Sequence, residues 1–152
     1  MIKISRPLGL FSTAVFLYLV LEMPAHIAMA NKLDTDISYF VDGAITIDAE
    51  NLVELYRSTQ DIALIDSRLS EDRVHGYIEM SHNLPASETD CAALAQLVGD
   101  KDRPVVFYDN GKISHDSMIA TTIAVLCGYN RLFWFSGGFT EWEDKDYPFV
   151  IE

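Results

Sequence analysis

The sequence has little positive charge. Among its 152 residues, 11 are lysine or arginine and 23 are aspartate or glutamate, which gives a formal net charge of −12. Affinity for nucleic acid or for anionic lipid depends on Lys and Arg side chains that neutralise phosphates. The composition therefore argues against both classes of partner, and we expect no nucleic-acid binding.

Cysteine is also scarce. Cys91 and Cys127 are the only two, and both lie in segments whose patterns indicate apolar faces of helices. Two cysteines establish no disulfide framework, so we expect buried free thiols, although an exported protein could form a disulfide. Neither cysteine lies in a loop suited to a reactive thiolate.

The first thirty residues have the layout of a secretory signal peptide. Lys3 and Arg6 precede an uncharged apolar run over residues 8–21, and Ala28 and Ala30 supply small residues at the two positions that a signal peptidase recognises. A membrane-spanning helix needs about twenty apolar residues, whereas Glu22 ends this run early. We expect cleavage after Ala30 in preference to a retained anchor. The mature protein is then predicted to be periplasmic or secreted, without membrane attachment.

The rest of the chain predicts one domain preceded by a short arm. Residues 31–47 are polar and mixed, and we interpret them as an arm that ends in a short extended piece. Residues 48–152 are predicted to form the domain, because a chain of this length buries enough apolar surface to fold as one unit.

Apolar runs and amphipathic segments alternate through this domain. Strands are predicted at residues 62–65, 105–108 and 132–135, a shorter extended piece at 81–84, and helices at 49–58, 92–98 and 118–127. Asp48 can act as the N-cap of the first helix. Parallel strands need crossover connections, which are usually helical. The alternation therefore predicts an α/β fold, a parallel central sheet with helices on both faces.

The loop after the 105–108 strand has the layout of an anion-binding site. It joins the carboxyl end of a buried strand to a helix that Ser114 or Asp116 is expected to cap. The free N–H groups of a helix's first turn and the helix dipole both favour an anion in such a loop. The candidate pocket residues are Asp109, Asn110, Gly111, Lys112, Ile113 and Ser114.

Six short motifs occur in the order and spacing of single-domain rhodanese-like proteins. They are Asp66-Ser67-Arg68, Gly76-Tyr77-Ile78, Val105 to Tyr108, Gly128-Tyr129, Gly137 to Trp142 and Tyr147-Pro148. Each motif alone is unspecific, but six in the right order make coincidence improbable. The chain resembles the rhodanese-like family over roughly residues 41–150, and the resemblance implies that family's α/β fold.

The same resemblance implies where the chemistry of an active member would lie. Active members carry sulfur as a persulfide on a cysteine at the first loop position, and loop amides and often an arginine stabilise the anion. Asp109 stands at the cysteine position here, and the candidate positions for the arginine are Ser114, His115 and Asp116. Lys112 is the only cation of the loop, and the family's histidine after the glycine is replaced by Tyr77.

These replacements predict a protein without sulfurtransferase activity. A carboxylate cannot hold a persulfide, and low-pKa cysteines need electropositive surroundings, whereas Asp109 and Asp116 are expected to make the pocket acidic. We expect an exported binding or accessory module whose partner is an envelope protein or a small ligand. The pocket would recognise a cation, a metal or a basic side chain of that partner.

Three sharper interpretations of the site residues are less favoured. Asp109 as a nucleophile would normally need a metal and further acidic residues. Asp109, His115 and Asp116 could converge on a metal, but no spacing is diagnostic, so we interpret them as solvated cap residues and expect no cofactor. Asp66 and Arg68 are expected to support the loop through an ion pair and backbone hydrogen bonds, and not to contact substrate.

The alternative function is an active sulfurtransferase that uses another cysteine. Cys127 lies thirteen positions beyond Ser114, at the far end of the predicted helix. That separation is ~20 Å at the helical rise per residue. A sulfur carried there would be far from the loop, so this alternative is disfavoured.

Overall fold

Five strands form one parallel sheet in the computed structural model, which describes residues 39–151. In chain order they are β1 (Ala44–Ile47), β2 (Ala63–Asp66), β3 (His82–Asn83), β4 (Val105–Tyr108) and β5 (Leu132–Phe135). Their order in space is β1-β5-β4-β2-β3, and every pair is parallel. The predicted fold class is confirmed. Because β4 is central, the loop that follows it lies at the middle of the sheet's carboxyl edge.

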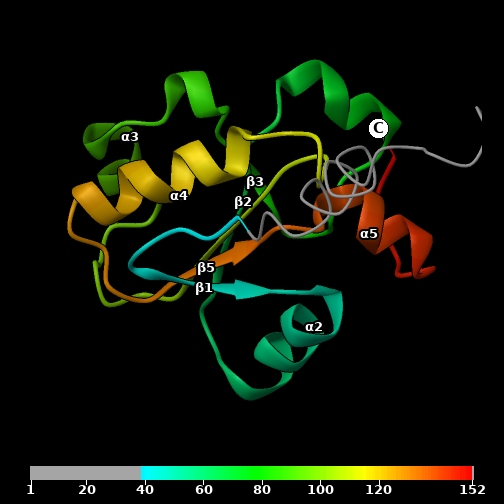
Figure 1. Cartoon of the computed structure of the whole chain (residues 1–152), viewed down its shortest axis with the longest axis horizontal. Coiled ribbons are helices and arrows are strands. Elements are labelled where there is room, and N and C mark those ends of the chain that lie inside the picture. The colour runs from blue at the N-terminus through cyan, green and yellow to red at the C-terminus, as the bar shows by residue number, and fades with distance from the viewer. Residues whose placement is uncertain (1–38, 152) are drawn as a thin grey trace, which may run out of the picture. The chain divides into compact units, whose positions relative to one another are not determined.

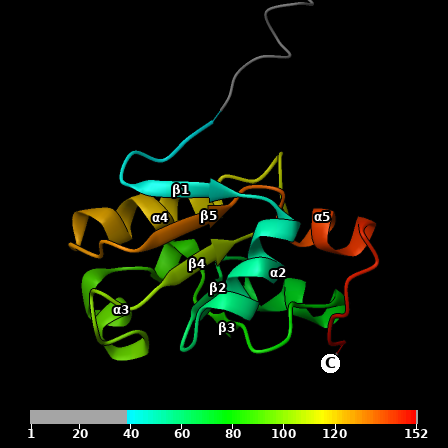
Figure 2. The same ribbon diagram turned by 90° about the horizontal axis from the view of Figure 1, so that it is seen from below.

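Helices cover both faces of this sheet (Figures 1 and 2). They are α2 (Ala49–Ser58), α3 (Cys91–Leu97), α4 (Asp116–Leu126) and α5 (Gly138–Asp144), with short 3₁₀ helices at Ser70–His75 and Ala86–Glu88. One buried apolar cluster joins α3 and α4 to the sheet, and a second joins α2 and α5 to its other face. This layering explains why β2 and β4 are buried along their whole length.

The start of α2 agrees with the sequence prediction. The Asp48 side chain accepts a hydrogen bond from the N–H of Asn51 at 2.8 Å, and the Asn51 side chain accepts one from the N–H of Asp48. Such a reciprocal pair satisfies two donors that a helix start leaves without partners.

The start of α4 differs from the prediction. Neither Ser114 nor Asp116 is the N-cap; that position is taken by His115, which makes no side-chain capping hydrogen bond. Ser114 and Asp116 make only long contacts with each other, at 3.4 Å. The first turn of α4 is instead bound by a residue at the end of β4, as described below.

The prediction of free thiols is wrong. Cys91, the first residue of α3, and Cys127, the C-cap of α4, form a disulfide with their Cα atoms 5.4 Å apart. The two helices pack against the same apolar cluster, which brings together residues that are 36 positions apart in the chain. The Cys91 end of the disulfide is exposed and the Cys127 end is buried.

The segment before α2 belongs to the sheet. The extended piece predicted at the end of the arm is β1, which pairs with β5 along four residues, and the compact unit begins at Phe40. The predicted signal peptide, residues 1–30, lies outside the described residues, as does most of the arm. Within residues 39–151, no helix has the length and apolar character needed to cross a bilayer.

Candidate functional site

Asp109, the first residue after β4, is buried with 1% of its surface exposed. Its Oδ1 atom accepts a hydrogen bond from the N–H of Gly111, and its Oδ2 atom accepts one from the N–H of Ser117, both at 2.8 Å. Ser117 lies in the first turn of α4. The carboxylate therefore binds the loop amide and the helix amide that such a loop offers to an anion.

This orientation changes the predicted electrostatics of the loop. We expected Asp109 and Asp116 to make the pocket acidic, but the Asp109 carboxylate points inward and is bonded to backbone N–H groups. Asp116 remains partly exposed at the start of α4. The negative charge at the first loop position is thus held inside the loop, in contact with the positive end of the helix dipole.

Glycines allow the loop to pack against the start of α5. The N–H of Phe139 donates to the carbonyl of Asp109 at 2.7 Å. Gly138 has φ +60°, and a Cβ atom there would lie 2.4 Å from that same carbonyl oxygen. Gly111 has φ +120°, and its Cβ would lie 2.4 Å from the carbonyl oxygen of Gly137. Both contacts are too short for any side chain, so the two backbones can touch only through glycine.

A second buried carboxylate, Asp66, stands at the end of β2, the strand next to β4. The Arg68 guanidinium forms two hydrogen bonds with it, from Nε to Oδ1 at 2.9 Å and from Nη2 to Oδ2 at 2.7 Å. Arg73 donates to Oδ2 at 3.0 Å, and the Tyr108 hydroxyl donates to it at 2.8 Å. The predicted ion pair of Asp66 and Arg68 is therefore present, within a larger network that the sequence did not indicate.

Burial and charge both act on the groups in this network. Burial alone lowers the pKa of Arg68, but its hydrogen bonds to Asp66 and the charge of that carboxylate outweigh burial and raise the pKa above its ordinary value. Burial and the neighbouring Asp66 raise the pKa of the Tyr108 hydroxyl. Arg68 stays charged and Tyr108 stays protonated, so both remain donors to Asp66.

Arg68 also connects this network to the loop after β4. Its Nη1 atom donates to the Asn110 side-chain oxygen at 3.3 Å, and its Nη2 atom donates to the carbonyl of Gly76 at 2.9 Å. The guanidinium carbon lies 4.6 Å from the centre of the Phe139 ring. All these partners belong to the protein itself, which gives Arg68 a positioning role toward the loop.

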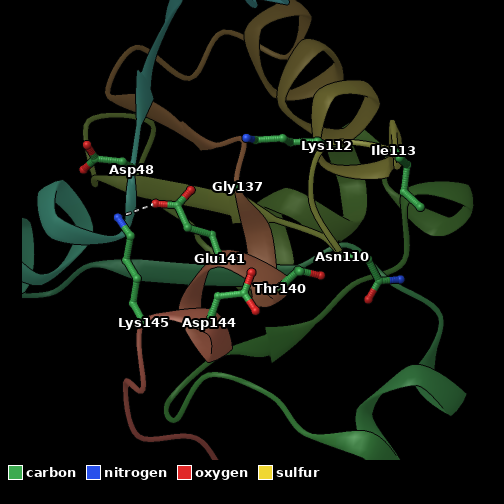
Figure 3. Close-up of a pocket in the computed structure, with 9 residues that line it drawn as sticks. All are labelled: Asp48, Asn110, Lys112, Ile113, Gly137, Thr140, Glu141, Asp144 and Lys145. Atoms are coloured by element: carbon green, nitrogen blue, oxygen red, sulfur yellow. Dashed lines mark ion pairs between the residues drawn. The ribbon is translucent and has the colours of Figure 1, made fainter.

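A cavity of about 680 Å³ lies beside the loop (Figure 3). Its lining comes from the loop, from the start of α2 and from α5: Asp48, Asn110, Lys112, Ile113, Gly137, Thr140, Glu141, Asp144 and Lys145. Three of the predicted pocket residues, Asn110, Lys112 and Ile113, line it, whereas Asp109, Gly111 and Ser114 do not. Sequence reasoning missed the lining from α5. The signal that could have found it is the Gly137 to Trp142 motif.

Two of the charged side chains in this cavity, Glu141 and Lys145, form an ion pair with each other. Lys145 forms ion pairs with Glu50 of α2 and with Glu141, the latter at 2.9 Å, as Figure 3 shows for Glu141. The hydrogen bond to Glu50 is the largest cause that raises the pKa of Lys145. Glu141 also accepts the N–H of Ala49 at 3.0 Å. These contacts tie α5 to α2 along one wall of the cavity.

The residues weighed as metal ligands do not form a site. In residues 39–151, no group of three or more His, Cys, Asp and Glu side chains is positioned to hold a metal ion. The carboxylate of Asp109 is directed at backbone amides, which differs from the convergence with His115 and Asp116 that a metal would need.

The sequence profile of the rhodanese-like domain family matches residues 48–145. Comparison with curated proteins gives no significant match. The profile match spans α2 to α5 and includes both buried carboxylates and the loop between β4 and α4.

Solved structures with a similar fold include three of different origin. Protein BH2092 of Bacillus halodurans has 16% sequence identity and a TM-score of 0.62, covering 84% of each chain. A rhodanese-related protein from Thermoplasma volcanium has 24% identity and a TM-score of 0.57, covering 71% of this chain and 99% of its own. The human single-domain sulfurtransferase TSTD1 has 27% identity and a TM-score of 0.54, covering 67% and 97% respectively.

Proposed function

The chain belongs to the rhodanese-like domain family, and we propose that it is a member without sulfurtransferase activity that acts as an exported binding or accessory module. The observation that carries this proposal is the state of Asp109. It is the first residue after β4, where the family resemblance implies the cysteine that carries sulfur, and its carboxylate already binds two backbone amides of the loop.

Two consequences of that arrangement oppose persulfide chemistry. A carboxylate oxygen cannot carry a sulfane sulfur, so the persulfide intermediate of the family cannot form at this position. The N–H groups of Gly111 and Ser117, which could stabilise a bound anion, are already hydrogen-bonded to Asp109. A thiosulfate or a persulfide would have to displace an internal carboxylate that is covalently part of the loop.

The cations near the loop are not directed at its opening. Arg68 and Arg73 both pair with Asp66 inside the domain. Lys112 is the only cation within the loop, and it lies on the wall of the neighbouring cavity. The loop after β4 thus lacks the positively charged surroundings that lower the pKa of a catalytic thiol.

The alternative of a sulfurtransferase that uses another cysteine gains no support. Cys91 and Cys127 are joined in a disulfide, so neither offers a thiolate to a sulfur donor. Cys127 is also the C-cap of α4, at the opposite end of that helix from the loop. It therefore lies ten positions beyond Ser117, whose backbone amide binds Asp109.

The disulfide also supports the proposed export. Disulfides persist in oxidising compartments and are rare where cellular thiols are kept reduced. Together with the signal-like start of the sequence, this favours a periplasmic or secreted protein. We propose that its partner is an envelope protein or a small ligand with a basic group, which contacts the cavity walled by Lys112, Ile113 and Asp144.

Cyanide-dependent thiosulfate sulfurtransferase activity of the purified protein tests the proposal. We expect no turnover above the uncatalysed rate, while the human single-domain sulfurtransferase assayed in parallel gives clear turnover. A Cys91→Ser/Cys127→Ser variant serves as the matched control. Turnover by the wild-type protein that disappears in this control would establish the alternative. Turnover that survives in the control would place the chemistry on another residue, and either result overturns the proposal.

A further inference from the structure

β1 is an edge strand of the sheet. It pairs in parallel with β5 from Ala44 to Ile47, and the described residues provide no strand on its other side. Figure 2 shows it at the upper edge of the sheet. Ile45 is 60% exposed, and Thr46 is exposed as well. The backbone of this strand is therefore available to another strand.

The composition of β1 does not protect it from such pairing. Natural proteins guard open strands with lysine, proline, bulges or inward charges. The four residues of β1 are Ala-Ile-Thr-Ile, which carry no charge and include three β-branched side chains. Their pairing with β5 is continuous and contains no bulge. In a chain with a net charge of −12, an uncharged strand at the sheet margin is a surface suited to contact.

An apolar strip accompanies the open strand on the α2 side of the sheet. Ile45 is the register partner of Phe133 in β5. Phe133 packs against the cluster that contains Ile47, two residues further along β1, so both side chains lie on that face. Two shallow cavities of about 310 and 330 Å³ flank the strip, and both are lined by Ile45 and Phe133.

Opposite charges stand at the two ends of this strip. Arg131 lines the cavity at the Ala44 end, and Glu54 lines the cavity at the Ile47 end. Neither side chain forms an ion pair with another described residue. Arg131 lies two positions before Phe133, which assigns it to the same face of the sheet as α2.

We propose that β1 pairs antiparallel with β1 of a second copy of this chain. An antiparallel two-fold arrangement brings the Arg131 end of each copy to the Glu54 end of the other, so the charge contact forms twice. The two Ile45–Phe133 strips then meet around the symmetry axis, and the two sheets join into one. The two cavities that flank the strip are lined by no residue of the loop after β4, so the proposal does not depend on the absence of sulfurtransferase activity.

Sedimentation of the purified protein over a wide range of concentration tests the pairing. We expect a monomer–dimer equilibrium, and we expect Ile45→Lys to weaken the dimer by at least about tenfold, because it adds a charge beside the same charge of the other copy. Ile113→Lys is the matched control, since Ile113 is 95% exposed on the loop after β4, and it should leave the dimer unchanged. Thr46→Lys provides a second variant, and circular dichroism verifies that each variant is folded.

Exchange of the two charges tests the orientation. Arg131→Glu alone and Glu54→Arg alone should each weaken the dimer, because like charges then face each other, and the double variant should restore it. High salt should reduce these differences. A wild-type monomer at every concentration, an effect of Ile113→Lys as large as that of Ile45→Lys, or a double variant no better than either single one overturns the proposal.

Discussion

The two buried carboxylates at the carboxyl edge of the sheet are held mainly by different kinds of group. Asp66 is held mainly by side chains: two arginines and a tyrosine donate to it, and the N–H of Arg68 adds one longer backbone hydrogen bond at 3.2 Å. Asp109, at the end of the neighbouring strand, is held by backbone N–H groups of the loop and of α4. Asp66 is fully buried and Asp109 is 1% exposed, so burial does not distinguish them.

The difference determines which hydrogen bonds a substitution of a neighbouring residue can remove. The side-chain partners of Asp66 are Arg68, Arg73 and Tyr108, and each could be lost through a single mutation. The partners of Asp109 are amides that every residue except proline provides. The arrangement around Asp109 therefore depends on the path of the backbone, which the close contacts of Gly111 and Gly138 impose.

The largest expected effect comes from removing the carboxylate that side chains hold. Asp66→Ala leaves two buried arginines without their counter-charge, so we expect a loss of about 3–5 kcal/mol in the free energy of unfolding, measured by denaturant titration. Asp61→Asn is the control, because its ion pair with Arg103 involves a carboxylate that is 78% exposed, and asparagine tolerates the φ of +59° at this position; it should cost at most about 1 kcal/mol. Equal losses would show that the buried network contributes no more to stability than the exposed ion pair.

A smaller loss is expected at the carboxylate that the backbone holds. Asp109→Ala removes two hydrogen bonds to a charged acceptor, and we expect about 1.5–3 kcal/mol of destabilisation in the same titration. Asp116→Ala removes only one long contact, from the Ser114 hydroxyl at 3.4 Å, and its cost should stay below about 1 kcal/mol. If the two variants unfold at the same denaturant concentration, the role given to Asp109 at the start of α4 is wrong.

Two tyrosines distinguish a hydroxyl inside the Asp66 network from one outside it. The Tyr108 hydroxyl donates to Asp66 and accepts from the N–H of Ile78, so Tyr108→Phe leaves that buried N–H without a partner and should cost about 1–3 kcal/mol. The buried Tyr56 hydroxyl has no hydrogen-bond partner among residues 39–151, so Tyr56→Phe should leave stability unchanged or raise it slightly. Thermal unfolding of both variants measures the contrast, and a larger loss for Tyr56→Phe would reverse the interpretation.

The burial of Tyr56 also predicts that the free energy of unfolding changes at alkaline pH. Burial raises its pKa to about 12, whereas the unfolded chain titrates near 10. Between these values the folded state retains a proton that the unfolded state releases, so stability should fall as pH rises through this window, by about 1 kcal/mol or less after solvent screening. Chemical unfolding at several pH values measures the slope. A slope as steep in Tyr56→Phe as in the wild type would contradict the assignment.

The smallest expected change is in activity. Asp109→Cys alone should restore almost no thiosulfate sulfurtransferase activity, because neither an arginine nor an electropositive loop accompanies the new thiol. The cyanide-dependent assay and mass detection of a persulfide measure it. Persulfide formation at the rate of an active relative would show that the loop around Asp109 is competent and that only the sulfur atom is missing.

The sequence predicted the elements whose signals are local. β4 and β5 have the predicted ranges, since each is a continuous apolar run, and α2 follows its N-cap at Asp48. The pairing of Cys91 with Cys127 was missed, because it depends on how α3 and α4 pack. The inward orientation of the Asp109 side chain was also missed. Its partners are backbone N–H groups, which nearly every residue type has, so the sequence does not indicate them.

The disulfide closes a covalent ring that contains the whole of β4 and the loop after it, since Cys91 precedes them and Cys127 follows α4. A protease that cuts this ring after the exposed Lys112 opens it without releasing a fragment. The nicked chain remains a single molecule until the disulfide is reduced, and only then do its two parts separate on a denaturing gel. The loop that resembles a catalytic site can thus be broken while the chain stays covalently joined.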